Sequence, residues 1–320
     1  MDAPLVSVNV SVYNHEAYIE RCLRSIASQK VDFPYEVFVG EDCSTDGTRA
    51  LLKEMAKELP PHFKFLFRER NMGGEANDAD MLFRSRGTYL AILEGDDFWT
   101  EDTKLQAQVD FLKSHPEYSA VFHRCVIVGK DSLPTGEKYP ECPREEYTFK
   151  EYFYCSMPGQ IGTSLIRREP YVAARKRFTE RSCYQRYAGD RRYAFILLSI
   201  GRVKSLPSVW SAYRHVQTGG SSYSATVRVD EEYARNEVQF GRTLVSYAEG
   251  CDNPEALRAA KLTYYRTYLK WSHGRIAPFS RKDCMRELMA ERDWPAYLFS
   301  PIRWSAVLVM RSLLGRGVTL

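Results

Sequence analysis

The chain has 320 residues, 44% of them apolar, which suffices for one large or two ordinary domains with a real core. Its net charge of +4 is uneven, since residues 255–320 carry 12 Lys and Arg against 5 Asp and Glu. The eight cysteines show no paired spacing, which argues against structural zinc and a disulfide framework. The sequence shows no signal peptide, no apolar stretch of about 20 residues and no nucleic-acid recognition module, so we expect a cytoplasmic protein.

Strands and helices alternate through the first hundred residues. Valines alternating with polar residues predict a strand over 6–12, and apolar residues at helical spacing predict a helix over 19–26 that Asn14 can cap. The alternation continues with strands over 35–39, 63–67 and 88–93 and with helices over 51–59 and 75–85. This order predicts parallel βαβ units.

The order changes beyond residue 100. A helix over 105–112 and a strand over 120–128 precede a loop over 129–147 and a further strand over 160–167. A helix from Asp190 to Gly201, strands over 203–206 and 209–213, and a flexible Gly/Ser loop over 218–222 follow. Beyond 226 the pattern is helical. We therefore predict an α/β domain over 1–225 and a helical C-terminal extension over 226–320.

Polar residues follow three of the predicted strands. Tyr13 and Asn14 come after the first, Asp42 after the second, and Glu94 to Asp97 after the fourth. Ligands of open α/β sheets bind outside the carboxyl ends of the strands. Each cluster alone is more typical of a cap or a turn, but their coincidence at one sheet edge favours a nucleotide site.

The acids Glu94, Asp96 and Asp97 lie within four residues of one another. Carboxylates this close repel unless a cation neutralises them. Hard oxygen ligands at a strand end suit Mn²⁺ or Mg²⁺, which share phosphate oxygens with a substrate. The cluster therefore predicts a metal-bound diphosphate.

Seven short stretches together resemble the family 2 glycosyltransferases, which have the GT-A fold. The resemblance covers roughly residues 5–222 and does not reach the helical tail. Its motifs are 10–14 (VSVYN), 40–48 (GEDCSTDGT), 70–74 (RNMGG), 94–99 (EGDDFW), 162–167 (GTSLIR), 189–191 (GDR) and 213–215 (YRH). It implies a Rossmann-like GT-A domain with a mixed, mostly parallel sheet and inverting sugar transfer from a nucleotide sugar.

The resemblance also implies roles for residues of the donor site. Asp42 is expected to pair with uracil, because a carboxylate can accept the N3–H of that ring, and a UDP-sugar is therefore the expected donor. Asp96 would lie near the ribose or the sugar, and Asp97 would hold the metal that bridges the diphosphate. Arg70 is placed to contact the phosphate or the base, although an arginine beside a turn is as often solvated.

Two later residues complete the implied site. Asp190 matches the position of the general base that takes the proton of the acceptor hydroxyl. It could equally be an acid at a helix start, favoured by the helix dipole, and the two roles are compatible. His215 is the candidate second metal ligand, but it directly follows Arg214, one position earlier than in the family motif, and on a strand such a slip turns the side chain to the other face.

Trp99 is the candidate acceptor-binding residue, because a flat indole can stack on a sugar ring. Its alternative is a core aromatic beneath the site. The tail, at 294–299 and 304–314, is apolar with aromatic residues and is interrupted by Arg303 and Arg311. That composition is typical of a helix at a membrane interface and predicts peripheral attachment to the inner face of the cytoplasmic membrane. Packing on the catalytic domain or on a partner subunit is the alternative.

The sequence thus predicts a metal-dependent inverting glycosyltransferase. Its donor would be a UDP-sugar and its acceptor a glycan or a lipid-linked glycan in cell-surface polysaccharide synthesis. One competing hypothesis is a nucleotidyltransferase, but that class normally shows a Gly-rich basic loop after the first strand, where this chain has Tyr13 and Asn14. The other is a non-catalytic, membrane-associated protein that binds nucleotide sugars, against which the retained acids argue.

Overall fold

The computed structural model describes residues 3–139, 142, 144–154, 157–181, 189–215 and 228–298. The predicted Gly/Ser loop, the predicted domain boundary at 225 and the end of the tail lie outside these residues. The described chain divides into two compact units. The first holds residues up to 148, 157–174 and 196–215, and the second holds 149–154, 175–181, 189–195 and 228–298.

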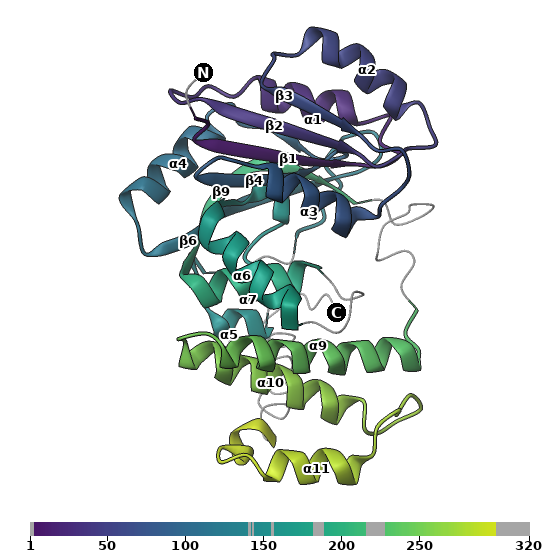
Figure 1. Cartoon of the computed structure of the whole chain (residues 1–320), viewed down its shortest axis with the longest axis vertical. Helices are drawn as coiled ribbons and strands as arrows, with labels where there is room; N and C mark the ends of the chain where they lie inside the picture. Colours follow the sequence, from purple (N-terminus) through teal and green to yellow (C-terminus); the bar gives the residue numbers. More distant parts are fainter. Residues whose placement is uncertain are drawn as a thin grey trace. The chain divides into compact units, whose positions relative to one another are not determined.

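Four parallel strands and the helices between them form the first half of the sheet, in the order β3-β2-β1-β4 (Figure 1). The strands are β1 (Val6–Val12), β2 (Tyr35–Glu41), β3 (Phe63–Phe67) and β4 (Tyr89–Glu94). The helices are α1 (Ile19–Ala27), α2 (Thr48–Glu58) and α3 (Gly74–Arg84). This half of the sheet confirms the predicted βαβ units.

The sheet continues beyond β4 with strands of both directions. β8 (Leu165–Arg167) is antiparallel to β4 and to β6 (Tyr118–Val128), and β9 (Arg202–Arg214) runs parallel to β6. The two-residue strands β5 (Phe98–Trp99) and β7 (Glu146–Tyr147) are antiparallel to β9. The sheet is therefore mixed and mostly parallel, which confirms the predicted fold class.

Some predicted elements differ from the structure. The two strands expected over 203–213 are the single strand β9, whose register against β6 shifts at three places. The strand expected from residue 160 begins with a 3₁₀ turn, η1 (Ile161–Thr163), before β8. The helices α5 (Phe149–Tyr154) and α6 (Arg168–Arg181) were not predicted, although Tyr171, Ala174 and Phe178 have helical spacing and are buried. The predicted helices appear as α4 (Lys104–Ser114) and α7 (Gly189–Ile200).

The core of the first unit lies around β1. Its four valines are 0–1% exposed because helices cover a parallel sheet on both faces. On the face of β1 opposite the valines, the buried Ser7 donates a hydrogen bond to the buried carboxylate of Glu36, 2.8 Å away. A buried core with paired polar groups makes β1 a rigid support for the loop that follows it.

The second unit contains three long helices that pack in sequence, α9 (Glu231–Glu249), α10 (Pro254–Lys270) and α11 (Arg281–Met289) (Figure 1). Asp230, Asn253 and Ser280 cap their first turns through side-chain oxygens that accept backbone N–H groups. Their core is rich in tyrosine, including Tyr264, Tyr265 and Tyr268. Within the described part of the chain, no helix combines the length and the apolar character needed to cross a bilayer.

Candidate active site

The register of the sheet brings the three predicted polar clusters to one edge. Val12 of β1 pairs with Glu41 of β2, and Ser11 pairs with Glu94 of β4, so the three strands end at the same level. Asn14, Asp42 and Asp96 therefore all lie one or two residues past a paired position. Neighbouring strands are about 4.8 Å apart, which places the ends of β2 and β4 roughly 10 Å from each other.

Hydrogen bonds tie the loop after β1 to the loop after β2. Asn14 has a φ of 58°, a left-handed conformation that asparagine tolerates better than most residues. Its Oδ1 accepts the N–H of Thr45 at 2.8 Å, and its own N–H donates to the Oγ of Ser44 at 3.0 Å. Tyr13, just before it, is half-buried. Asn14 thus holds the two loops together at the edge where a nucleotide is expected.

The loop after β4, residues 94–97, is called the acid loop below. Glu94, Asp96 and Asp97 each offer one carboxylate oxygen, and these oxygens all lie within 4.8 Å of one another. The backbone is fixed by the N–H of Gly95, which donates to Ser11 O at 2.9 Å, and by the N–H of Asp97, which donates to Glu94 O at 3.0 Å. Three convergent oxygens of negative charge are the donor set that a hard divalent cation prefers.

Asp97 is the most buried of the three acids, at 1% exposure. Its Oδ2 accepts the side-chain N–H of Gln160 at 3.0 Å, and its Oδ1 accepts the backbone N–H of Arg214 at 2.7 Å. Burial raises the pKa of Asp97 well above its usual range, and the charges of Asp96 and Glu94 raise it further. A divalent cation would relieve this repulsion, so the residues fit a metal.

The raised pKa of Asp97 predicts that metal affinity depends on pH. Below that pKa the carboxyl group carries a proton, which must leave before the oxygen can bind a cation. Mn²⁺ affinity should therefore fall as the pH decreases, by up to about tenfold per pH unit. Calorimetric titrations at unit steps from about pH 5 to about pH 8 measure this, and an affinity that stays constant over that range contradicts it.

His15 is a site residue that the sequence reasoning missed. Its Nε2 lies 4.0 Å from Oδ1 of Asp96, and its buried Nδ1 has no hydrogen-bond partner among the described residues. A Cβ on Gly95 would come within 2.8 Å of that Nδ1, so glycine is what lets the ring lie against the acid loop. Burial lowers the pKa of His15, although Asp96 opposes the shift. Its position directly after Asn14 was the available signal.

The structure gives Asp42 two backbone partners. Its Oδ1 accepts the N–H of Met72 at 2.7 Å, and its Oδ2 accepts the N–H of Gly73 at 2.9 Å. Asp42 is buried and holds the loop between β3 and α3, on which Arg70 is exposed. Each carboxylate oxygen can accept one further hydrogen bond, so the predicted contact with a base stays open for Asp42.

The two remaining polar candidates are not members of the acid cluster found among the described residues. Nδ1 of His215 lies 3.0 Å from Oε2 of Glu137, and the histidine is not a member of the acid cluster found among the described residues. Asp190 belongs to the second unit, where it is exposed in the first turn of α7. The metal role of His215 and the base role of Asp190 stay predictions.

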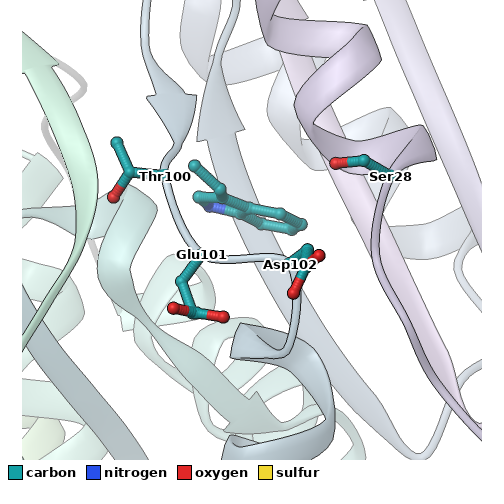
Figure 2. A pocket seen from close by; sticks show the side chains of 5 residues that line it. Ser28, Thr100, Glu101 and Asp102 are labelled. Atoms are coloured by element: carbon teal, nitrogen blue, oxygen red, sulfur yellow. The ribbon is translucent and has the colours of Figure 1, made fainter.

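Trp99 lies in the core, at 4% exposure. Its Nε1 donates to Gly162 O at 3.0 Å, and the Nζ of Lys104 is 3.9 Å from the centre of its ring. This placement corresponds to the core alternative, because the indole is almost fully covered by protein. Trp99 also lines a hollow of about 320 Å³, whose other lining residues are Ser28, Thr100, Glu101 and Asp102 (Figure 2). The hollow contains none of the three acids.

Comparison with known proteins identifies the family. The model of glycosyl transferase family 2 matches residues 7–172. TuaG of Bacillus subtilis, which is named for teichuronic acid biosynthesis, is 37% identical over 166 residues, or 52% of this chain and 63% of that protein. Rv1520 of Mycobacterium tuberculosis is 41% identical over 128 residues, or 40% of this chain and 37% of that protein. The matched region therefore spans between a third and two thirds of these relatives.

Among solved structures, S. aureus TarS 1–349 in complex with UDP-GlcNAc matches with a TM-score of 0.60 and 18% identity. The match covers 91% of this chain and 81% of that one, and at this identity it shows a shared fold. The family match covers just over half of the chain and includes the acid loop. The chain belongs to glycosyl transferase family 2, a family of enzymes that transfer sugars.

Proposed function

We propose that this glycosyltransferase is metal-dependent and inverting, and that it moves a sugar from a UDP-sugar to a glycan or lipid-linked acceptor in cell-surface polysaccharide synthesis. The observation that carries the proposal is the acid loop, where three carboxylate oxygens converge within 4.8 Å at the carboxyl end of β4. Family membership favours sugar transfer over the nucleotidyl transfer that the sequence left as an alternative.

Glu94, Asp96 and Asp97 would hold Mn²⁺ or Mg²⁺, which acts as a Lewis acid on a leaving diphosphate. Asp97 is oriented for this role by Gln160 and by the backbone of Arg214. Asp96, which is partly exposed, remains accessible to the ribose or the sugar. Asp190 would take the proton of the attacking hydroxyl, and the position of an inverting base is opposite the leaving group.

The nucleoside would lie across the ends of β1 and β2. Tyr13 and Asn14 line one side of this edge, and Asp42 would accept the N3–H of uracil while it holds the loop at Met72 and Gly73. Arg70 is exposed on the same loop and makes no ion pair with a described residue, so it is available for a phosphate. The UDP-GlcNAc bound to TarS supports a UDP-sugar donor.

The acceptor side is proposed from composition and from the relatives. TuaG is named for teichuronic acid biosynthesis, which supports a glycan acceptor. The aromatic and basic tail from residue 294 supports peripheral attachment to the inner face of the cytoplasmic membrane. A lipid-linked acceptor would be reached from that position.

The proposal predicts donor binding that requires metal. With Mn²⁺ present, UDP and UDP-sugars should raise the Tm of the protein, whereas CDP should raise it much less because cytosine has no N3–H. With a chelator the shift should disappear. Replacing Asp42 with asparagine should weaken UDP binding by about tenfold or more, as expected for loss of a charge-assisted hydrogen bond worth about 1.5–3 kcal/mol.

A neighbouring buried acid provides the control for Asp42. Glu36 is 3% exposed and pairs with Lys64 near the opposite end of β2, so Glu36→Gln should change stability but not the preference for UDP. Equal Tm shifts with UDP and CDP would refute the uracil contact. A UDP shift that persists without divalent metal would refute the metal-dependent site.

A further inference from the structure

Arg214, at the end of β9, connects three segments that are distant in sequence. Its Nε donates to Asp96 O at 3.0 Å, its Nη2 donates to the Oγ of Ser132 at 2.8 Å, and its Nη1 donates to Gly129 O. Its backbone N–H donates to the carboxylate of Asp97. The side chain is 5% exposed. One residue therefore joins β9, the acid loop and the turn at 129–132.

The guanidinium group of Arg214 also has a fixed plane. Its Cζ lies 3.9 Å from the ring centre of Tyr18, the residue just before α1. All three of its nitrogens donate to protein oxygens, and it forms no ion pair within 4.0 Å with a described carboxylate. A planar guanidinium group packed against an aromatic ring fixes both the distance and the direction of its hydrogen bonds, which a lysine ammonium cannot do.

We propose that Arg214 is a positioning residue of the metal site, and this rests on the proposed function, in which the acid loop binds a divalent cation. Asp96 and Asp97 repel each other and Glu94, so a free loop would spread its carboxylates. Arg214 holds the backbone of Asp96 through its side chain and the carboxylate of Asp97 through its backbone. Both acids are thereby fixed relative to a single residue.

The test measures Mn²⁺ binding to the protein without a donor, by electron paramagnetic resonance of the free ion. Arg214→Ala should weaken Mn²⁺ binding at least tenfold, about 1.4 kcal/mol. Arg214→Lys should bind Mn²⁺ almost as weakly as Arg214→Ala, because one ammonium cannot make the three in-plane contacts. Low-millimolar guanidinium should restore binding to Arg214→Ala by filling the vacated space, whereas methylammonium, which has the same charge, should not.

Two further variants complete the experiment. Arg202→Ala is the matched control, since Arg202 begins the same strand, is 57% exposed and pairs with Glu146 instead of the acid loop, so it should keep the wild-type affinity. Ser132→Ala removes one partner of Arg214 and should weaken Mn²⁺ binding by a smaller factor than Arg214→Ala. This variant tests the positioning role even if Arg214→Ala does not fold.

Wild-type affinity in Arg214→Ala, or equal rescue by methylammonium, would overturn the positioning role and leave the proposed function intact. Absence of Mn²⁺ binding in the wild-type protein would instead overturn the proposed function.

Discussion

Asp97→Asn should abolish metal-dependent donor binding and lower the rate of sugar transfer by about 10³-fold. The reason is that a Lewis acid on the leaving diphosphate contributes several kcal/mol to transition-state stabilisation, and about 4 kcal/mol corresponds to that factor. Asparagine keeps the shape of the side chain but offers a cation only a neutral oxygen. Turnover with saturating Mn²⁺ and donor, together with Mn²⁺-dependent UDP binding, measures both effects.

The same substitution should not destabilise the metal-free protein. Burial and like charges raise the pKa of Asp97 in the folded state, so the folded protein favours the protonated carboxyl group. The free energy of unfolding of the wild-type protein therefore decreases as the pH rises through that raised pKa. Asparagine is never charged, and this gain at high pH offsets the one hydrogen bond that its Nδ2 cannot accept from Gln160 or Arg214, so near pH 8 the variant should melt close to the wild-type Tm.

Asp102→Asn is the matched control for Asp97→Asn. Asp102 is partly exposed, pairs with Lys30 and lies outside the acid cluster, so its loss should leave metal binding unchanged. Retained Mn²⁺-dependent binding in Asp97→Asn would contradict the ligand role. A large fall in its Tm would attribute the lost activity to unfolding.

The first half of the fold follows from local pattern. β1 and its neighbours are buried on both faces. The residues of β1 itself, including Val6, Val8 and Val10, therefore suffice to predict the strand. The short strands β5 and β7 carry no such pattern. Each has two residues, and each is a strand only because β9 pairs with it. Pairing between distant segments is a tertiary property that a local window of sequence does not contain.

The candidate site likewise combines residues that local sequence predicts with residues that distant segments contribute. Asp96 and Asp97 were predicted because they follow a recognisable strand and are adjacent in sequence. Gln160 and Arg214, which orient Asp97, come from 63 and 117 residues further along the chain. Trp99 shows the limit for a single residue, since only its hydrogen bond to Gly162 O and its contact with Lys104 distinguish a core indole from one that stacks on a sugar.

Asp190→Asn should leave donor and metal binding intact and lower kcat by about 10²- to 10⁴-fold, the usual contribution of a general base. An amide cannot take a proton from the acceptor hydroxyl at neutral pH, but it keeps the size of the carboxylate. Separate measurements of kcat, of donor KM and of UDP affinity distinguish loss of the chemical step from loss of binding. Donor hydrolysis by water should fall in parallel, since water needs the same base.

The alternative role of Asp190 is stabilisation of the N-terminus of α7, where an acid contributes about 0.3–1 kcal/mol. Asp283 provides a matched control, because it is an exposed acid in the first turn of α11 within the same unit. Asp283→Asn should leave kcat at the wild-type value, whereas Asp190→Asn should lower it. If Asp190→Asn also retains near-normal kcat, its carboxylate is a helix-end charge, and the base of the reaction must be sought among other residues.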